Sequence, residues 1–230
     1  MKKSFLISIF AILTFYGNGQ VQNLIDSLEN KISSLKENPS DSTYYLWLSY
    51  YDLVDEYERL SQPDVALNAF EESLKYAPND TFKFQSYYRR IVWFAEQHNP
   101  EMTMSLATKM LKALPDYREA KTSAYMFMAV AHEHRKDPVN AIKYYEKSMA
   151  SAIESQDSSS YYMVMMNMAN TIFDSGDKEK AIKLYKSGVA FYSKVPGSHQ
   201  QTLGLLNNIG TGYMGVNSDS VFKYLNEVKR

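Results

Sequence analysis

The sequence predicts an all-α fold built from helix pairs that repeat along the chain, and three observations predict it. Residues of matching type recur at intervals of 37, 38 and 40 residues. Within each interval, apolar residues are spaced by three, four and seven positions, as on one face of an α-helix. Glycine is scarce, at 9 of 230 residues, which disfavours a turn-rich β fold. Since 45% of the residues are apolar and 22% are charged, the chain has the composition of one that folds.

Residues 1–19 have the layout of a secretory signal peptide. Lys2 and Lys3 precede a mostly apolar run that ends at Tyr16, and small and polar residues follow it. The run is shorter than the roughly 20 apolar residues that span a bilayer. We therefore expect cleavage after Gly19 and export to the periplasm or extracellular face of a Gram-negative-type bacterium. An uncleaved N-terminal anchor is the alternative.

Residues 20–39 are predicted to form an amphipathic helix that caps the repeats. Pro39 is expected to stop this helix. One side of the helix is an apolar stripe, and this stripe would cover the open N-terminal end of a repeat domain at residues 40–230. The stripe consists of Val21, Leu24, Ile25, Leu28, Ile32 and Leu35.

Each repeat is expected to contain two helices, and the residues at the N-terminus of the second helix locate it. In three of four copies a residue that can cap a helix stands four positions before a reference position, and in three of four copies a proline stands three positions before it. The preceding helix recurs with the same phase. The reference positions are Ala66, Thr103, Ala141 and Ala181. The predicted repeats cover about residues 44–79, 82–117, 120–156, 159–196 and, in part, 200–230.

This pattern resembles the tetratricopeptide repeat family. The resemblance is carried most sharply by the fourth copy, which reads Met168, Ala169, Gly176, Asp177, Ala181 and Tyr185, and then by the first, which supplies Tyr57, Ala66, Phe70 and Pro78. The second copy departs from the family's pattern, with Arg90 at an apolar position and Thr103 for alanine. The resemblance implies a right-handed α-solenoid of about five helix pairs with an N-terminal capping helix. It is to the exported bacterial type, similar to the sensor regions of repeat-containing signalling proteins.

The histidines and methionines do not indicate a catalytic or metal site. His132 and His134 are two positions apart on a predicted helix, whereas a helical zinc pair needs a spacing of four. His132 holds an aromatic position of the repeat and is expected to pack. The methionines between Met163 and Met168 are expected to fill the core, with a soft-metal site as the alternative. No cysteine is present. We therefore expect no enzyme, no cofactor and no metal.

Two further classes of ligand are disfavoured. Gly210, Gly212 and Gly215 match a dinucleotide-binding fingerprint, but the residues before them are expected to form a helix and not a strand. The formal net charge is −1, so no basic excess is available to neutralise the phosphates of a nucleic acid. The expected partner is a protein or peptide.

In this family the first helices of successive repeats line a concave groove, and the resemblance implies the same here. The groove is expected to be apolar and aromatic with a few amides, which suits a helix or an extended peptide. Val130, Phe173 and Thr211 are expected beside the main set, although Val130 and Met166 have burial between helices as an equal alternative. The predicted partner-binding residues are Leu48, Tyr51, Asp55, Tyr88, Val92, Met126, Met166, Asn170 and Asn207.

These features lead to two functional hypotheses. The first is a non-catalytic exported scaffold that binds a peptide or protein partner in the groove. The alternative is the ectodomain, possibly truncated, of a bacterial signal-transduction protein such as a histidine kinase or transcriptional regulator, which would have a membrane-associated signalling partner. The last helix is expected from about Asp219 with Val221, Leu225 and Val228 apolar and without a cap. This end is expected either to continue into further chain or to form a homodimer.

Overall fold

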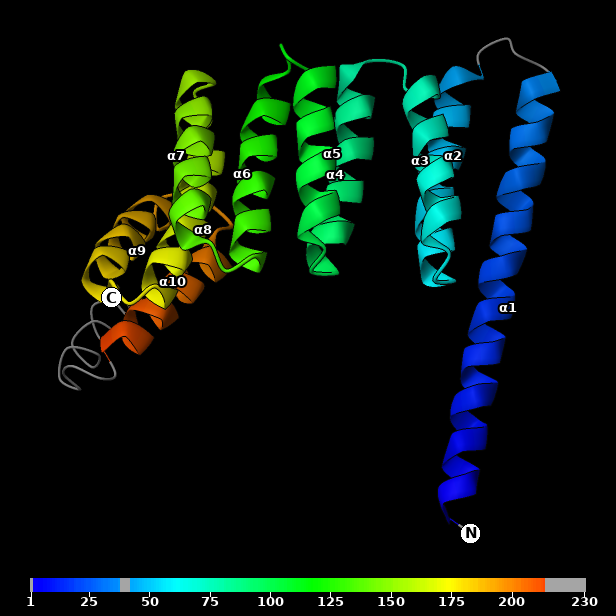
Figure 1. The fold of residues 1–230 in the computed structure, drawn as a ribbon, viewed down its shortest axis with the longest axis horizontal. Helices are drawn as coiled ribbons and strands as arrows, with labels where there is room; N and C mark the ends of the chain where they lie inside the picture. The colour runs from blue at the N-terminus through cyan, green and yellow to red at the C-terminus, as the bar shows by residue number, and fades with distance from the viewer. Residues whose placement is uncertain (1, 38–41, 214–230) are drawn as a thin grey trace. The chain divides into compact units, whose positions relative to one another are not determined.

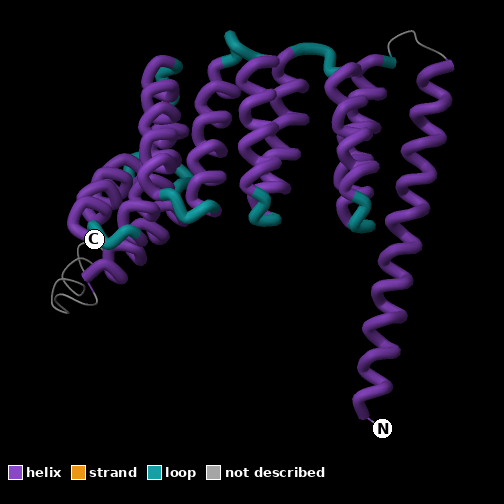
Figure 2. The backbone as a smooth tube through the Cα atoms, in the orientation of Figure 1, coloured by secondary structure: helices purple, strands orange, loops and turns teal. Residues whose placement is uncertain are grey.

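A computed structural model describes residues 2–37 and 42–213, with side chains from residue 19 onward. Within these residues every regular element is a helix (Figures 1 and 2), which confirms the predicted all-α fold. Four helix pairs follow an N-terminal helix, and the first helix of a fifth pair comes last. The helices are α1 (Lys2–Glu37), α2 (Thr43–Arg59), α3 (Pro63–Tyr76), α4 (Asp80–Glu96), α5 (Pro100–Ala113), α6 (Arg118–His134), α7 (Pro138–Glu154), α8 (Ser158–Asp174), α9 (Lys178–Tyr192) and α10 (His199–Tyr213).

The helices form two compact units, residues 1–90 and residues 91–230. In the first unit α1 packs on α2, and α2 packs on α3. In the second unit each helix from α5 to α10 packs against the next one. The apolar face of each helix is therefore buried by its neighbours in sequence, as in a repeat protein.

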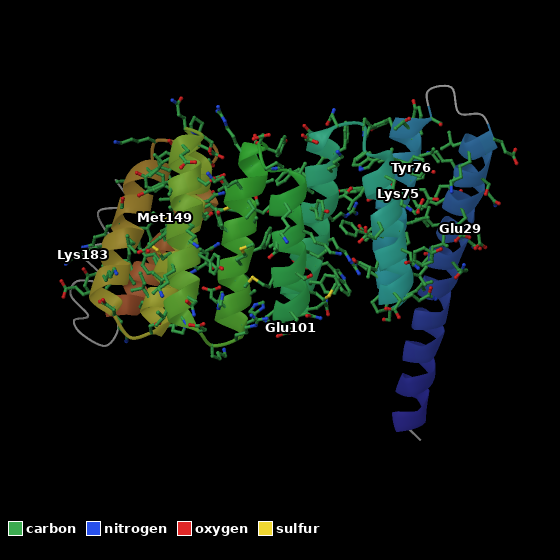
Figure 3. All side chains as sticks on the ribbon, turned by 45° about the horizontal axis from the view of Figure 1, so that its top comes forward. Glu29, Lys75, Tyr76, Glu101, Met149 and Lys183 are labelled. Carbon is green, nitrogen blue, oxygen red and sulfur yellow. The ribbon has the colours of Figure 1, made fainter. Side chains whose placement is uncertain are left out.

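Helix α1 covers α2 with the second half of its length. Ile25 is 1% exposed and Ile32 is buried, and polar contacts flank them. The hydroxyl of Tyr57 donates a hydrogen bond to the carboxylate of Glu29, which lies on α1 (Figure 3). These contacts confirm the N-terminal capping helix, although Leu24 of the predicted apolar stripe is 45% exposed.

The same helix also contains the predicted signal peptide. It runs without a break from Lys2 to Glu37, so cleavage after Gly19 stays a prediction. A search of the described residues finds no helix with the length and apolar character needed to cross a bilayer.

The reference positions of the repeats are the most closely packed points of the core. All four of them, Ala66, Thr103, Ala141 and Ala181, are 0% exposed. Two glycines of the last pairs serve the same purpose. A Cβ atom on Gly188 would lie 2.8 Å from Leu205, and one on Gly212 would lie 2.9 Å from Ile182. Small residues thus allow α9 and α10 to approach each other closely.

One loop conformation recurs between the two helices of each pair. A residue with positive φ precedes the helix cap in every copy: Ser61, His98, Lys136 and Gly176. Asn99 then caps α5 by accepting a hydrogen bond from the backbone N–H of Met102, and aspartates cap α7 and α9 in the same way. Gln62, at the start of α3, makes no such side-chain bond. The three capping residues identified in the sequence are confirmed.

The C-terminal part differs from the sequence prediction at one point. The fourth repeat was predicted to extend to about residue 196, but its second helix, α9, ends at Tyr192 and a turn follows. The Ser198 hydroxyl donates to the Tyr192 carbonyl in that turn, which satisfies a carbonyl at the helix end. The expected last helix and its apolar residues lie in 214–230, outside the described residues, as does Gly215. Gly210 and Gly212 lie within α10, so the dinucleotide fingerprint lacks its strand.

Candidate binding site

A polar hollow lies in the second unit on the face formed by the first helices of successive repeats. Its larger part has a volume of about 740 Å³ and lies between α6, the start of α7 and α8. Its smaller part, of about 360 Å³, continues along α8 to α9 and α10, and both parts share Asn170 and Asp174. The larger part is lined by Val130, Glu133, His134, Lys136, Pro138, Tyr145, Asn167, Asn170, Thr171, Asp174 and Ser175. The smaller part adds Phe173, Tyr185, Asn208 and Thr211.

Glu133 is the central acid of the polar hollow. Its carboxylate accepts a hydrogen bond from the hydroxyl of Thr171 on the next repeat. Burial raises the pKa of Glu133, and the nearby carboxylate of Asp174 raises it further, while the Thr171 bond opposes the shift. Among the described residues, neither Glu133 nor Asp174 forms an ion pair with a lysine, arginine or histidine. Lys136 also lines the larger part of the hollow, so the hollow contains two carboxylates and a lysine that is not paired directly with either of them.

The hydroxyl of Tyr145 adds a buried polar atom to this acid. Tyr145 is 0% exposed and lines the larger part of the hollow, and its hydroxyl lies beside Glu133 and Thr171 without forming a hydrogen bond of normal geometry. Burial raises the pKa of Tyr145 well above its ordinary value, and the adjacent Glu133 adds to the rise. The phenol is therefore neutral.

Asn170 is held in a fixed orientation where the two parts of the hollow meet. Its side-chain oxygen accepts a hydrogen bond from the Tyr185 hydroxyl at 2.7 Å and another from the Asn208 amide at 3.2 Å. With the oxygen engaged on one side, the amide NH₂ group is left to donate. A peptide carbonyl is a suitable acceptor for such a donor.

His134 forms the other end of the larger part. Its ring lies 4.6 Å from that of His98, edge to face. Burial lowers the pKa of His134, and its neighbours His98 and Lys136 lower it further. The imidazole is therefore uncharged at neutral pH and adds no positive charge to the hollow. His132 points elsewhere and stacks on Tyr144, as expected for a packing residue.

The predicted groove residues of the second unit are distributed unevenly over this site. Asn170 lines both parts of the hollow. Asn207 is exposed on α10, and Val92 and Met166 are half-buried. Met126 is 7% exposed, so it is a core residue and the prediction that it contacts a partner is wrong.

The chemical character of the hollow also differs from the prediction. An apolar and aromatic surface was expected, but carboxylates, amides and hydroxyls line most of it. Val130, Phe173 and Thr211 do line it. Two of the residues missed lie three or four positions after predicted ones, a spacing that could have identified them, and the other three directly follow a predicted residue in the sequence. They are Glu133, Asn167, Thr171, Asp174 and Asn208.

The predicted residues of the first unit form a separate cluster around Arg89, which the sequence reasoning missed. The Arg89 guanidinium lies 4.3 Å from the centroid of the Tyr51 ring and forms an ion pair with Asp55. Leu48 is half-buried, and the Tyr88 ring lies 5.6 Å from that of Phe84. Tyr51 and Asp55 are therefore already engaged within the unit.

Within the described residues, no three His, Asp or Glu side chains are grouped so that they could hold a metal ion. The side chains that line the hollow are mainly hydrogen-bonding and charged groups.

Comparison with known proteins agrees with the repeat architecture. A tetratricopeptide repeat model matches residues 49–80. No curated protein matches the chain by sequence. The structure is similar to that of BtubC (BKLC) from P. vanneervenii, with 13% identity, a TM-score of 0.72, and coverage of 91% of this chain and 90% of the other.

Two other solved structures share the architecture. The repeats of a putative kinesin light chain from Podosopora anserina match with 15% identity and a TM-score of 0.59, over 83% of this chain and 95% of the other. A signal transduction ATPase with a tetratricopeptide repeat sensor, from Pyrococcus horikoshii, matches with 16% identity and a TM-score of 0.66. The match covers 87% of this chain and 32% of the ATPase. Likeness at these identities shows the fold, an all-α repeat solenoid.

Proposed function

Because the chain is a tetratricopeptide-repeat protein, we propose that it is a non-catalytic scaffold that binds a peptide or protein partner in the polar hollow. The observation that supports this most strongly is the continuity of the hollow across α6, α8 and α10. Three successive repeats contribute to it, which suits an elongated ligand better than a small molecule.

The lining of the hollow favours an extended peptide. Asn170 presents a donor, and the exposed Thr211 and half-buried Asn167 and Asn208 supply further polar groups along the same face. Polar groups at intervals along a groove can pair with the backbone of an extended chain, while pockets between them accept side chains.

The test is selection from a random octapeptide library with the purified chain as bait. We expect binders whose affinity falls about ten-fold or more in the double variant Asn170→Ala, Asn208→Ala, because both amides would be lost. Gln201→Ala, at an exposed position of α10 outside the hollow, is the matched control. Absence of any binder, or equal affinity in the double variant, would contradict the proposal.

Export is the second part of the proposal, with a periplasmic or extracellular location. It is supported by the signal-peptide layout of residues 1–19. Expression of the full sequence in a Gram-negative host and N-terminal sequencing of the periplasmic fraction should give Gln20 as the first residue. An intact Met1 on protein found only in the cytoplasm would refute it.

A sensor region of a signalling protein is a second candidate. It is favoured by the structural match to the repeat sensor of the signal transduction ATPase, and a membrane-associated signalling partner would follow from it. Sequencing of the source DNA beyond the codon for Arg230 tests it, since an output domain in the same frame is expected. The proposed homodimer through the C-terminal end involves residues 214–230, outside the described residues, and sedimentation of the purified chain tests that.

A further inference from the structure

A buried arginine in the first unit shows which group can satisfy acceptors of the kind that line the polar hollow. Arg90 is 1% exposed and pairs with Glu58, whose side chain is 8% exposed. Its second terminal nitrogen donates to the carbonyl oxygen of Pro63 at 3.3 Å. One guanidinium thus satisfies a carboxylate and a helix-start carbonyl in a buried site, which its planar set of donors allows.

The third repeat carries the same acceptors at the same positions. Glu58 and Glu133 both stand eight residues before the reference position of their repeat. Pro63 and Pro138 both stand three residues before it, and Pro138 lines the hollow beside Glu133. The two partners that Arg90 binds in the first unit therefore have counterparts on the wall of the hollow.

The second unit has no arginine at the position equivalent to Arg90. Arg90 stands thirteen residues before the reference position of its repeat, and the residue at that position after the third repeat is Met168. Met168 is buried and apolar. The Glu133 carboxylate accepts a hydrogen bond from the Thr171 hydroxyl and has the neutral Tyr145 hydroxyl beside it, so hydroxyl groups stand where the first unit has a guanidinium. The site thus retains the acceptors of an arginine pocket and lacks the arginine.

A tyrosine hydroxyl and a second carboxylate add further polar groups beside Glu133. Four residues after the reference position, the first repeat has Phe70 and the third has Tyr145, whose buried hydroxyl has no partner among the described residues. Asp174 places a second carboxylate on the same wall. Burying such groups is unfavourable unless something pairs with them.

We propose that the polar hollow receives an arginine side chain of the bound peptide, with Glu133 as its counter-ion. The guanidinium takes the place that Arg90 holds in the first unit, donating to the Glu133 carboxylate and towards Pro138, with Asp174 adding negative charge. Asn170 donates to the peptide backbone next to the arginine. This inference rests on the proposed function, since it names the partner chemistry at the same site.

The test uses the octapeptides selected with the purified chain. We expect arginine at one fixed position of the binders. Replacing it with citrulline, which has nearly the same shape but no charge, should raise the Kd about ten-fold or more. Glu133→Gln should cause a similar loss with the arginine peptide and little further loss with the citrulline peptide. Glu179→Gln, at an exposed position of α9, should leave both affinities unchanged.

A second variant keeps the test independent of any folding defect. Met168→Arg places an internal arginine where the first unit has Arg90, and it should pair with Glu133 and abolish binding of the arginine peptide. Met168→Leu should bind as the wild type does. Thermal unfolding of each variant identifies any that does not fold, and the conclusion then rests on Glu133→Gln.

The outcomes separate the two proposals. Binders without arginine at a fixed position that still require Asn170 and Asn208 would overturn the arginine inference and leave the peptide scaffold standing. Arginine-containing binders that are insensitive to Glu133→Gln would also overturn it, because the arginine would then bind elsewhere. If the library yields no binder at all, the scaffold proposal fails first and the arginine inference with it.

Discussion

Glu58 and Glu133 occupy the same position of two repeats, and their surroundings differ in one decisive respect. In the first unit the carboxylate of Glu58 is neutralised by the buried guanidinium of Arg90. In the second unit the corresponding position holds Met168, and a pocket of about 740 Å³ opens beside Glu133. One repeat thus pairs its acid with a buried guanidinium, whereas the other leaves it without an ion pair among the described residues. Arg90 departs from the repeat pattern, and this departure fills a site in the first unit that has no arginine in the second unit.

The largest expected effect comes from removing the internal cation. Arg90→Met gives the first unit the residue that the second unit has, and it leaves the Glu58 carboxylate buried without its partner. We expect a loss of about 3–5 kcal/mol in unfolding free energy, as for other broken buried ion pairs. Urea unfolding followed by far-UV circular dichroism measures it.

The double variant Glu58→Gln, Arg90→Met is the control for that effect. It removes both charges, so most of the loss should be recovered. If the single and double variants were equally unstable, packing of the arginine side chain and not the charge would account for the loss.

The exchange of phenylalanine and tyrosine between the repeats should have a smaller effect. Phe70 is 1% exposed, and Phe70→Tyr adds a hydroxyl to an apolar environment, which should cost about 1–3 kcal/mol. The reverse change, Tyr145→Phe, removes a hydroxyl that has no partner among the described residues and should be neutral or slightly stabilising. Thermal unfolding compares the two. A loss of stability in Tyr145→Phe would mean that the hydroxyl has a partner in solution.

The helix caps differ between the repeats in a way that predicts a gain. Gln62 makes no side-chain cap bond, whereas Asp157 accepts one from the backbone N–H of Ser160 at 3.0 Å. Gln62→Asp should cap α3 and stabilise the chain by about 0.5–1 kcal/mol. Asp157→Ala should cost about the same amount at the start of α8. Chemical unfolding of both variants checks the pair, and no gain in the first would show that the Gln62 backbone does not suit a cap.

The caps and loops illustrate what could be read from the sequence. The aligned prolines and the acidic or amide residues before them located the starts of four helices, because capping depends on residue type within one turn. The small reference residues predicted close packing for the same local reason. Helix ends were harder to predict. The end of α9 at Tyr192 depends on a hydrogen bond from the Ser198 hydroxyl, which no local sequence pattern indicates.

The binding site could be predicted only in part. The helical phase singled out Asn170, which lines both parts of the hollow, because helical periodicity fixes which residues share a face. It also placed Met126 on the surface, although the structure buries it at 7% exposure, since how far a helix is turned into the core depends on its neighbours. The lack of an ion pair at Glu133 could not be predicted from local sequence, because the residue equivalent to Arg90 is Met168, which lies 35 positions later and belongs to the next repeat.

The smallest expected effect is the pH dependence that Glu133 gives to the free protein. Burial raises the pKa of this carboxyl above its ordinary value, so the folded state disfavours ionisation relative to the unfolded chain. The unfolding free energy is therefore highest below the ordinary pKa of a glutamate, where Glu133 is protonated. It falls as the pH rises through the pKa of Glu133 in the folded state. Glu133→Gln cannot ionise. Its stability should therefore match the wild type near about pH 4 and exceed it by a growing margin above about pH 5.

Urea unfolding of both proteins across this pH range measures the difference, with Glu179→Gln as an exposed control. A bound arginine peptide should remove the difference, because the guanidinium favours the ionised carboxylate. If the wild type instead became more stable than Glu133→Gln as the pH rose without peptide, Glu133 would already have a cation in the free protein. The contrast with Glu58 would then disappear, since both repeats would satisfy their acid internally.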